Sequence, residues 1–169
     1  MLAFAVSFDG PIAIRYPRGS AHQGLREYQA PVEYGRSEII RKGKKIAVLG
    51  VGSMIPSCME ICKGLKDDGY DPTFVNARFV KPLDVDLLDE LAKDHSLFVT
   101  VEENVKSGGY GEHVSAYMEA CHPEIRVLSA AVWDRFVPQG NVESLRSRIG
   151  LGVEDIRQAI EDSEELREQ

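Results

Sequence analysis

Hydrophobic residues follow two alternating patterns along most of the chain: short apolar runs, and longer stretches in which they recur every three or four positions. Runs at 45–49, 73–75, 97–101 and 125–132 predict buried strands. The stretches between and after these runs predict helices that each turn one apolar face to a core. The apolar positions of these helices are Ile55, Cys58, Met59, Cys62 and Leu65, then Leu87, Leu88 and Leu91, then Val114, Tyr117, Met118 and Cys121, and finally Val153, Ile156 and Ile160. Alternating strands and helices predict a three-layer α/β fold with a mainly parallel sheet.

One edge of this sheet is predicted from a turn. The Lys-Gly-Lys sequence at 42–44 separates segment 38–41 from the strand at 45–49, and this arrangement is typical of an antiparallel hairpin. We therefore expect one antiparallel edge hairpin beside the parallel strands. Ser53 and Asp84 each precede a helical stripe, and both are expected to cap the helix that follows.

The N-terminal part of the chain has a different pattern. Residues 12–16 alternate between apolar and other side chains and have breakers on both sides, which predicts a strand. Residues 1–5 are apolar and are interpreted as the tail of a helix. We expect residues 1–19 to be a remnant of a preceding domain, residues 20–36 to be a linker, and residues 37–169 to form the α/β domain.

Composition narrows the class of protein. The 169 residues are 43% hydrophobic and 28% charged, as in ordinary globular proteins. The net charge of −7 argues against general binding to nucleic acid or to anionic membranes, and no run approaches the roughly 18 apolar residues of a membrane span. Cys58, Cys62 and Cys121 are interpreted as buried thiols in a reducing compartment, which favours the cytoplasm. The histidines have no ligand spacing, so no metal site is expected.

Three arginines are candidates for binding an anion. In an open α/β sheet, ligands bind at the carboxyl ends of the strands. Arg15 lies near the end of the predicted strand and Arg18 follows it, and two guanidinium groups there suit a phosphate. Arg78 follows the strand at 73–75, where its charge must meet either a carboxylate of the protein or an anionic ligand. The residues alone leave both possibilities open, with a structural ion pair the commoner outcome.

Other polar motifs give weaker signals. The Gly-Val-Gly-Ser turn at 50–53 lacks the spacing of a nucleotide-binding loop and is interpreted as ordinary turn chemistry. Glu102 and Glu103 are adjacent in a strand and point in different directions, so they are expected to hold loops and backbone N–H groups rather than to act as an acid/base pair. His113 is a general base by residue type, but no nucleophile accompanies it. We therefore predict no catalytic residue.

Four segments together resemble a known family. They are GPIAIRYPRG at 10–19, RFVKPLD at 78–84, VEEN at 101–104 and DRFVPQG at 134–140. In this order they resemble the C-terminal part of the 1-deoxy-D-xylulose-5-phosphate synthases, thiamine diphosphate enzymes of the transketolase group. The resemblance implies a transketolase C-terminal domain preceded by the last strand of a pyrimidine-binding domain.

The resemblance also implies roles for the candidate residues. The family joins pyruvate, after decarboxylation, to glyceraldehyde 3-phosphate in the isoprenoid precursor pathway. Arg15 and Arg78 match arginines that hold the phosphate of the aldehyde, and Arg18 lies near the same place. The Mg²⁺ motif and the glutamate that activates thiamine belong to other domains, so no cofactor-binding or metal-binding residue is expected in this chain. The resemblance implies a homodimer whose thiamine-binding domains reside in the same or a separate chain.

Two alternatives remain at this point. The chain alone is expected to be inactive, and a purely structural dimerisation module would also have these properties. The C-terminal part of a related protein, such as the β subunit of a 2-oxoacid dehydrogenase, is the other possibility. The RYPRG segment at 15–19 and the RFVKPLD segment at 78–84 fit the synthases better.

Overall fold

The sheet and its order are the framework of the molecule. The computed structural model describes residues 1–16, 22, 24–25, 27–28 and 30–163. Within them, five strands form one sheet in the order β1-β3-β2-β4-β5. The pairing of β1 with β3 is antiparallel and the other pairings are parallel. This confirms the predicted α/β class with a mainly parallel sheet. The strands are β1 (Glu38–Arg41), β2 (Lys45–Gly50), β3 (Thr73–Asn76), β4 (His95–Val105) and β5 (Arg126–Val132).

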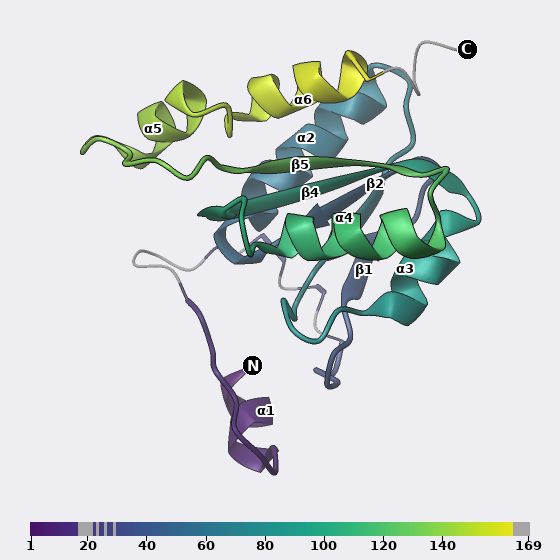
Figure 1. Cartoon of the computed structure of the whole chain (residues 1–169), viewed down its shortest axis with the longest axis vertical. Helices are drawn as coiled ribbons and strands as arrows, with labels where there is room; N and C mark the ends of the chain where they lie inside the picture. The colour runs from purple at the N-terminus through teal and green to yellow at the C-terminus, as the bar shows by residue number, and fades with distance from the viewer. Residues whose placement is uncertain (17–21, 23, 26, 29, 164–169) are drawn as a thin grey trace.

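Helices cover both faces of the sheet, which gives the three layers seen in Figure 1. On one face lie α2 (Ile55–Asp67) and α6 (Val153–Glu161), whose buried residues share a core with one side of β2 and β4. On the other face lie α3 (Val85–Ala92) and α4 (Tyr110–Cys121), which share a second core with the opposite side of the same strands. The remaining helical elements are α1 (Leu2–Ser7), η1 (Gly52–Met54) and α5 (Val142–Arg148).

Strand β2 shows why the buried strands are continuous apolar runs. Ile46 and Val48 belong to the core beneath α2, whereas Ala47 and Leu49 belong to the core beneath α3 and α4. All four side chains are fully buried. A strand that is covered on both faces needs apolar residues at every position, so the period-2 alternation disappears. No helix in the described part of the chain combines the length and hydrophobicity of a membrane span.

The edge strand is antiparallel, but the predicted hairpin is wrong. Strand β1 pairs with β3, in the register Glu38↔Asn76, and not with β2. The turn at 42–44 is tied to the residues that precede and begin β3, because the Gly43 amide donates to Thr73 Oγ1 at 2.8 Å and the Lys44 amide donates to the carbonyl of Asp71 at 2.6 Å. These bonds hold the turn across the start of β3, so β3 lies between β1 and β2.

The predicted strand at 12–16 is also wrong. Residues 11–16 have no regular secondary structure and join no strand ladder within the described chain. An alternating sequence needs a neighbouring strand to become a sheet, and none of the described edges pairs with it. The preceding residues do form a helix, α1, and its Phe4 and Phe8 pack against Tyr34 and Phe79 with ring centroids 5.0–5.9 Å apart.

Of the two predicted helix caps, one is confirmed and the other is wrong. Asp84 caps α3 as expected, since its carboxylate accepts the Leu87 amide at 3.4 Å. Ser53 does not cap α2, because it lies inside the 3₁₀ turn η1 and its hydroxyl donates to the carboxylate of Glu103. An ionised acceptor forms the stronger hydrogen bond, so the hydroxyl turns towards it and away from the helix.

The cysteines differ in their environment. Cys58 and Cys62 are buried as predicted, and burial raises the pKa of the Cys62 thiol to about 12. Cys121 is exposed, so the prediction for this thiol is wrong. It is the last residue of α4 and lines a surface pocket at the helix end, past the part of the helix that packs on the sheet.

Candidate anion site at the carboxyl edge of the sheet

The carboxyl edge of the parallel strands carries most of the singled-out motifs. Strand β2 ends at Gly50 and continues into η1, β3 ends at Asn76 just before Arg78, and β4 continues through Glu102 and Glu103. Because parallel strands point the same way, these three loops lie at one edge of the sheet. This is the edge at which open α/β sheets bind ligands.

Glu102 closes the N-terminus of α4. The residue is 2% exposed, and its carboxylate accepts the Tyr110 amide at 3.0 Å and the Gly111 amide at 2.8 Å. The prediction that this glutamate binds backbone N–H groups is confirmed. An internal anion therefore already occupies the positive end of the helix dipole, so this N-terminus is not available to a phosphate.

Glu103 points away from Glu102 and gathers three other residues. One carboxylate oxygen accepts Nε of Arg146 at 2.8 Å and lies 2.7 Å from its NH2 nitrogen. The other oxygen accepts the hydroxyl of Ser53. The guanidinium of Arg15 donates to the main-chain carbonyl of Glu103 at 3.4 Å. We call these four residues, Arg15, Ser53, Glu103 and Arg146, the Glu103 cluster.

Arg78 is held in an ion pair. Its NH2 nitrogen lies 2.5 Å from a carboxylate oxygen of Glu38, and the side chains are 12% and 8% exposed. Its NH1 nitrogen donates to the carbonyls of Ala30 and Pro31, both at 3.1 Å. Glu38 also accepts the amide of Ala30 at 3.1 Å. Arg78 and Glu38 together hold the segment that leads into β1. Of the two partners that the sequence left open for Arg78, a carboxylate of the protein or an anionic ligand, the structure shows the carboxylate.

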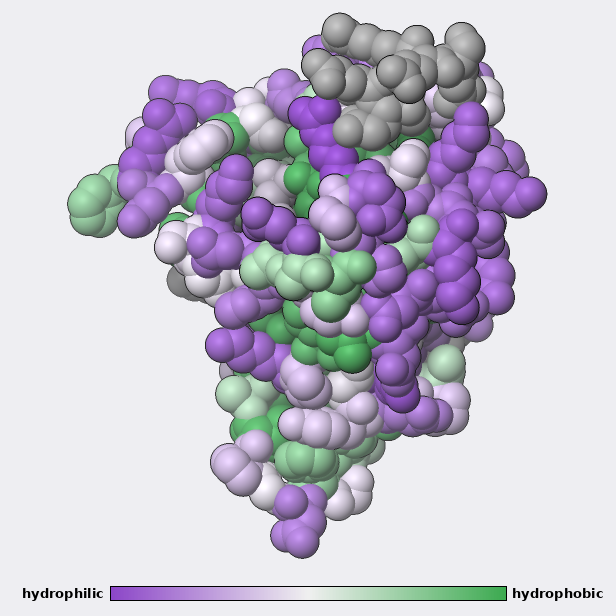
Figure 2. Space-filling view, turned by 45° about the vertical axis from the view of Figure 1, so that its right-hand side comes forward, coloured by the Kyte–Doolittle hydropathy of each residue, from purple (hydrophilic) through white to green (hydrophobic). Residues whose placement is uncertain are grey.

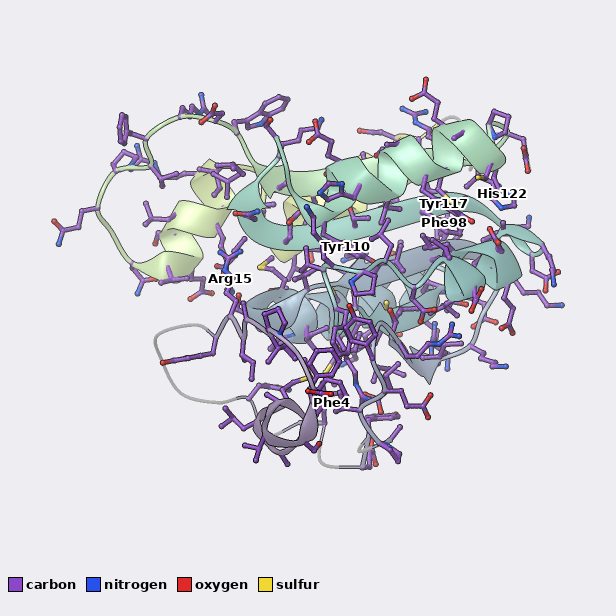
Figure 3. All side chains as sticks on the ribbon, turned by 60° about the horizontal axis from the view of Figure 1, so that its bottom comes forward. Phe4, Arg15, Phe98, Tyr110, Tyr117 and His122 are labelled. Atoms are coloured by element: carbon purple, nitrogen blue, oxygen red, sulfur yellow. The ribbon has the colours of Figure 1, made fainter. Side chains whose placement is uncertain are left out.

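The predicted phosphate-binding arginines contact different glutamates in the structure. Arg15 contacts Glu103, and Figure 3 shows it on the extended segment after α1, towards α5. Arg78 contacts Glu38. Arg18 lies outside the described residues. A shared phosphate for these arginines therefore stays a prediction.

The described residues show no arrangement suited to holding a metal ion. No group of three His, Cys, Asp or Glu side chains in the described ranges is placed to hold a metal ion. The α4 N-terminus, which would suit a diphosphate, is closed by Glu102. His113 lies in the first turn of α4, with no nucleophile found beside it in the described contacts.

Sequence reasoning missed Glu38 and Arg146. Glu38 reaches Arg78 across two paired strands, and Arg146 reaches Glu103 from the last turn of α5. In both cases, the partners are about 40 residues apart, and only the sheet order brings them together. A weak signal existed for Arg146, because a basic residue in the last turn of a helix is favoured by its dipole.

A second polar cluster lies at the other end of the sheet. Asp89 of α3 accepts the hydroxyl of Tyr117 at 2.8 Å and lies 2.8 Å from Nε2 of His122. The hydrogen bond from His122 lowers the pKa of Asp89, and the Asp89 carboxylate raises the pKa of Tyr117 to about 12. These residues line an open pocket of about 550 Å³, and Figure 3 shows Tyr117 and His122 side by side near the end of α4. Sequence reasoning did not identify this cluster.

The fold and the motifs at its carboxyl edge define the class of protein. A mixed, mainly parallel five-stranded sheet with helices on both faces is shared with transketolase-like solved structures. The sequence profile of "Transketolase, C-terminal domain" matches residues 35–156, so the chain belongs to this family.

Sequence comparison with individual proteins makes the relationship more specific. The chain is 41% identical over 157 residues to the 1-deoxy-D-xylulose-5-phosphate synthase of Lachnoclostridium phytofermentans, an alignment that covers 92% of this chain and 25% of that protein. It is 39% identical over 161 residues to the synthase of Dictyoglomus thermophilum, covering 95% of this chain and 26% of that protein. The chain thus spans about a quarter of the length of these relatives, and it is homologous to their C-terminal part.

Solved structures give the same fold. A protein described as "Split gene transketolase, inactive beta4 tetramer" superposes with a TM-score of 0.74 at 29% identity, over 85% of this chain and 47% of that chain. The transketolase of Campylobacter jejuni superposes with a TM-score of 0.51 at 16% identity, over 76% of this chain and 19% of that chain. The second similarity concerns the fold alone.

Proposed function

We propose that this chain acts as the C-terminal part of a thiamine diphosphate-dependent 1-deoxy-D-xylulose-5-phosphate synthase, where it contributes to binding the phosphate of glyceraldehyde 3-phosphate. The observation that carries the proposal is the identity of 41% with a synthase across 92% of the chain. The family resemblance of segments 10–19 and 78–84 supports the same assignment, because these segments contain Arg15, Arg18 and Arg78. In this proposal residues 1–19 belong with a preceding domain and residues 37–169 form the C-terminal domain.

The division of labour follows from which residues are present. Thiamine diphosphate and Mg²⁺ would be held by other domains, in the same or a separate chain, as the family resemblance implies. The cofactor supplies the activated two-carbon unit from pyruvate. This chain's contribution is electrostatic: guanidinium groups at the carboxyl edge bind and orient the phosphorylated aldehyde. In this proposal the chain alone is a binding and assembly part with no turnover of its own, and it resides in the cytoplasm.

Two measurements test the proposal. The chain is assayed alone and after addition of the thiamine-binding domains, with thiamine diphosphate, Mg²⁺, pyruvate and glyceraldehyde 3-phosphate. We expect activity only in the combined sample, and turnover by the chain alone would refute the division of labour. In the active assembly, Arg78→Ala and Arg15→Ala should each raise the KM for the phosphorylated aldehyde about tenfold or more, because a charge-assisted hydrogen bond contributes about 1.5–3 kcal/mol. Equal changes in the KM for pyruvate would refute the phosphate role.

A second candidate function is self-association. Helix α1 packs Phe4 inwards but leaves Leu2 75% exposed and Val6 90% exposed, one turn apart on the same face. Figure 2 shows hydrophobic residues gathering at the end of the molecule where α1 lies. The neighbour at 29% identity is described as a tetramer of one chain type. These observations favour a homo-oligomer formed through α1, either as the chain's own assembly or alongside the synthase function.

A further inference from the structure

The segment between β5 and Leu151 lies on the surface of the molecule along its whole length. None of residues 133–150 is buried, and Phe136 is fully exposed. The residues on either side differ, since Ala131 is 7% exposed and Leu151 is 1% exposed. Figure 1 shows this segment, which contains α5, projecting beyond the carboxyl ends of β4 and β5. We call residues 133–150 the α5 flap.

One ion pair joins the middle of the α5 flap to the sheet. Nε and the NH2 nitrogen of Arg146 lie 2.8 Å and 2.7 Å from the same carboxylate oxygen of Glu103. At the ends of the flap, Ile149 packs at the margin of the core beneath α2, and the Trp133 ring lies 5.0 Å from the Lys106 ammonium. The other described hydrogen bonds of the flap stay within it or reach the residue that follows it.

We propose that the α5 flap is a hinged cover of the carboxyl edge, which opens while the sheet stays folded, and that the Arg146–Glu103 ion pair is the latch that holds it closed. The free energy of a local opening is set by the contacts that break. Here these are one ion pair and little buried apolar surface, whereas unfolding of the domain exposes both cores. Opening of the flap should therefore be far more frequent than global unfolding.

Gly150 gives the flap a hinge at its C-terminal end. Its φ of 76° lies in the left-handed region, and a Cβ at this position would have no atom within 4 Å beyond its chain neighbours. A glycine in open space changes its φ and ψ without a steric cost, so rotation there needs no rearrangement of the core. At the other end, residues 133–140 contain neither helix nor strand, so no regular element resists the rotation.

Opening changes what the carboxyl edge presents to solvent. Glu103 loses Arg146, while the other members of the Glu103 cluster, Ser53 and Arg15, keep their contacts to it. Because open α/β sheets bind ligands at this edge, the position of the flap sets access to it. This motion lies within the chain itself and is independent of the proposed synthase function.

Native-state hydrogen exchange of the full chain, followed by NMR at several low urea concentrations, tests the flap. The amides of Leu145 and Ile149 are hydrogen-bonded within α5, and the amide of Val99 lies in β4. We expect the open state at the two α5 amides to be about a hundredfold or more as populated as at Val99, with a smaller dependence on urea because less surface is exposed. Exchange of all three amides at one common free energy would refute the flap, since α5 would then open only when the whole domain unfolds.

Variants on both sides of the ion pair test the latch. Arg146→Gln and Glu103→Gln should each accelerate exchange of the α5 amides about three- to tenfold, with no further gain in the double variant, because each removes the same interaction. Arg148→Gln is the matched control, since it removes the other basic side chain from the last turn of α5 and lies outside the ion pair. It should leave the exchange nearly unchanged.

Two results would overturn the latch. One is equal exchange of the α5 amides in Arg146→Gln and Arg148→Gln. The other is unchanged exchange in Glu103→Gln, because simple fraying of α5 depends on the helix and not on a carboxylate of β4. Salt provides a readout that needs no substitution of the latch: raising NaCl from about 0.05 M to about 0.5 M should accelerate α5 exchange in the unmodified chain and not in Arg146→Gln. A salt effect of equal size in both would also count against the ion pair as the latch.

Discussion

His95 is a buried histidine whose two ring nitrogens both have partners. Nδ1 lies 2.7 Å from the carbonyl of Leu91, and Nε2 lies 2.7 Å from the hydroxyl of Thr73, which itself accepts the Gly43 amide. A carbonyl only accepts, so the proton of the neutral ring is on Nδ1 and Nε2 accepts the Thr73 hydroxyl. This network explains how the start of β4, the start of β3 and the turn at 42–44 are held together.

Protonation of His95 should weaken the fold. Burial lowers the pKa of His95 below its ordinary value of 6.5, against the opposing hydrogen bond to Leu91. The unfolded chain therefore takes up this proton first as the pH falls, so the free energy of unfolding should be constant above about pH 6.5 and decrease below it. Urea unfolding between pH 7.5 and 5 measures this slope. His95→Gln should remove part of this slope, and an unchanged slope in His95→Gln would contradict the argument.

Arg78 and Glu38 form an ion pair that is almost fully buried. Arg78→Ala leaves the Glu38 charge without its partner, and breaking a buried pair in this way costs about 3–5 kcal/mol of stability. Arg15→Ala, at an exposed position, should change stability by no more than about 0.5 kcal/mol. Urea unfolding compares the two variants. The double variant Glu38→Leu/Arg78→Met should recover most of the loss, whereas equal stability of both single variants would show that the pair is not structural.

The sequence shows that Arg78 needs an anion but not which one. An arginine between apolar stretches must be neutralised, and this follows from local chemistry. The identity of the partner depends on the antiparallel register of β1 and β3, which places Glu38 opposite Asn76. Nothing within a few residues of Arg78 encodes that register. For the same reason the roles of Glu102 were predictable, since its partners Tyr110 and Gly111 follow it closely in the chain.

At the scale of elements, the packing of α4 on the sheet depends on Gly111. A Cβ at this position would lie 2.3 Å from Ser129 Oγ and 2.4 Å from Thr100 Oγ1, on strands β5 and β4. Gly→Ala inside a helix ordinarily stabilises by about 0.5–1 kcal/mol. Here the close approach should reverse the sign, and Gly111→Ala should destabilise by about 1–3 kcal/mol through overpacking.

The rescue variant follows from the same contact. Ser129 Oγ is buried without a hydrogen-bond partner in the described chain, so Ser129→Ala should be close to neutral by itself. Combined with Gly111→Ala, it should restore part of the lost stability by opening space for the new methyl group. Thermal unfolding of the three variants measures this. A Gly111→Ala variant that is more stable than the unmodified chain would show that α4 moves away from the sheet at little cost.

Element boundaries were predictable where the signal was local. The apolar stripe of α2 and the Asp84 cap of α3 follow from spacing and from one side chain, and both are present. The prediction of a hairpin was wrong because the turn at 42–44 is hydrogen-bonded to Asp71 and Thr73, which are nearly 30 residues away. The prediction of a strand at 12–16 was wrong because strand formation requires a partner strand. Pairing is a tertiary property, and a single segment does not contain it.

At the scale of the whole molecule, α1 is attached by one side only. Phe4 and Phe8 bind it to Tyr34 and Phe79, and Phe79 is adjacent to the arginine that clamps the linker. The opposite side of α1 presents Leu2 and Val6 to solvent. Because this apolar face lies on a helix whose other side is already packed, little ordering would be needed for a second copy of the chain to dock on it, and we propose that it does.

We therefore expect the chain to self-associate through α1. Leu2→Glu/Val6→Glu places charges on the exposed face while leaving the ring contacts of Phe4 intact, and it should shift the chain towards monomer by at least about tenfold in dissociation constant, since charges in an apolar interface are costly. Sedimentation equilibrium measures the shift. Phe136→Ser is the matched control, because Phe136 is a fully exposed aromatic residue outside α1. If the control dissociates the oligomer and the α1 variant does not, the contact lies in the loop after β5, and the free face of α1 has another partner.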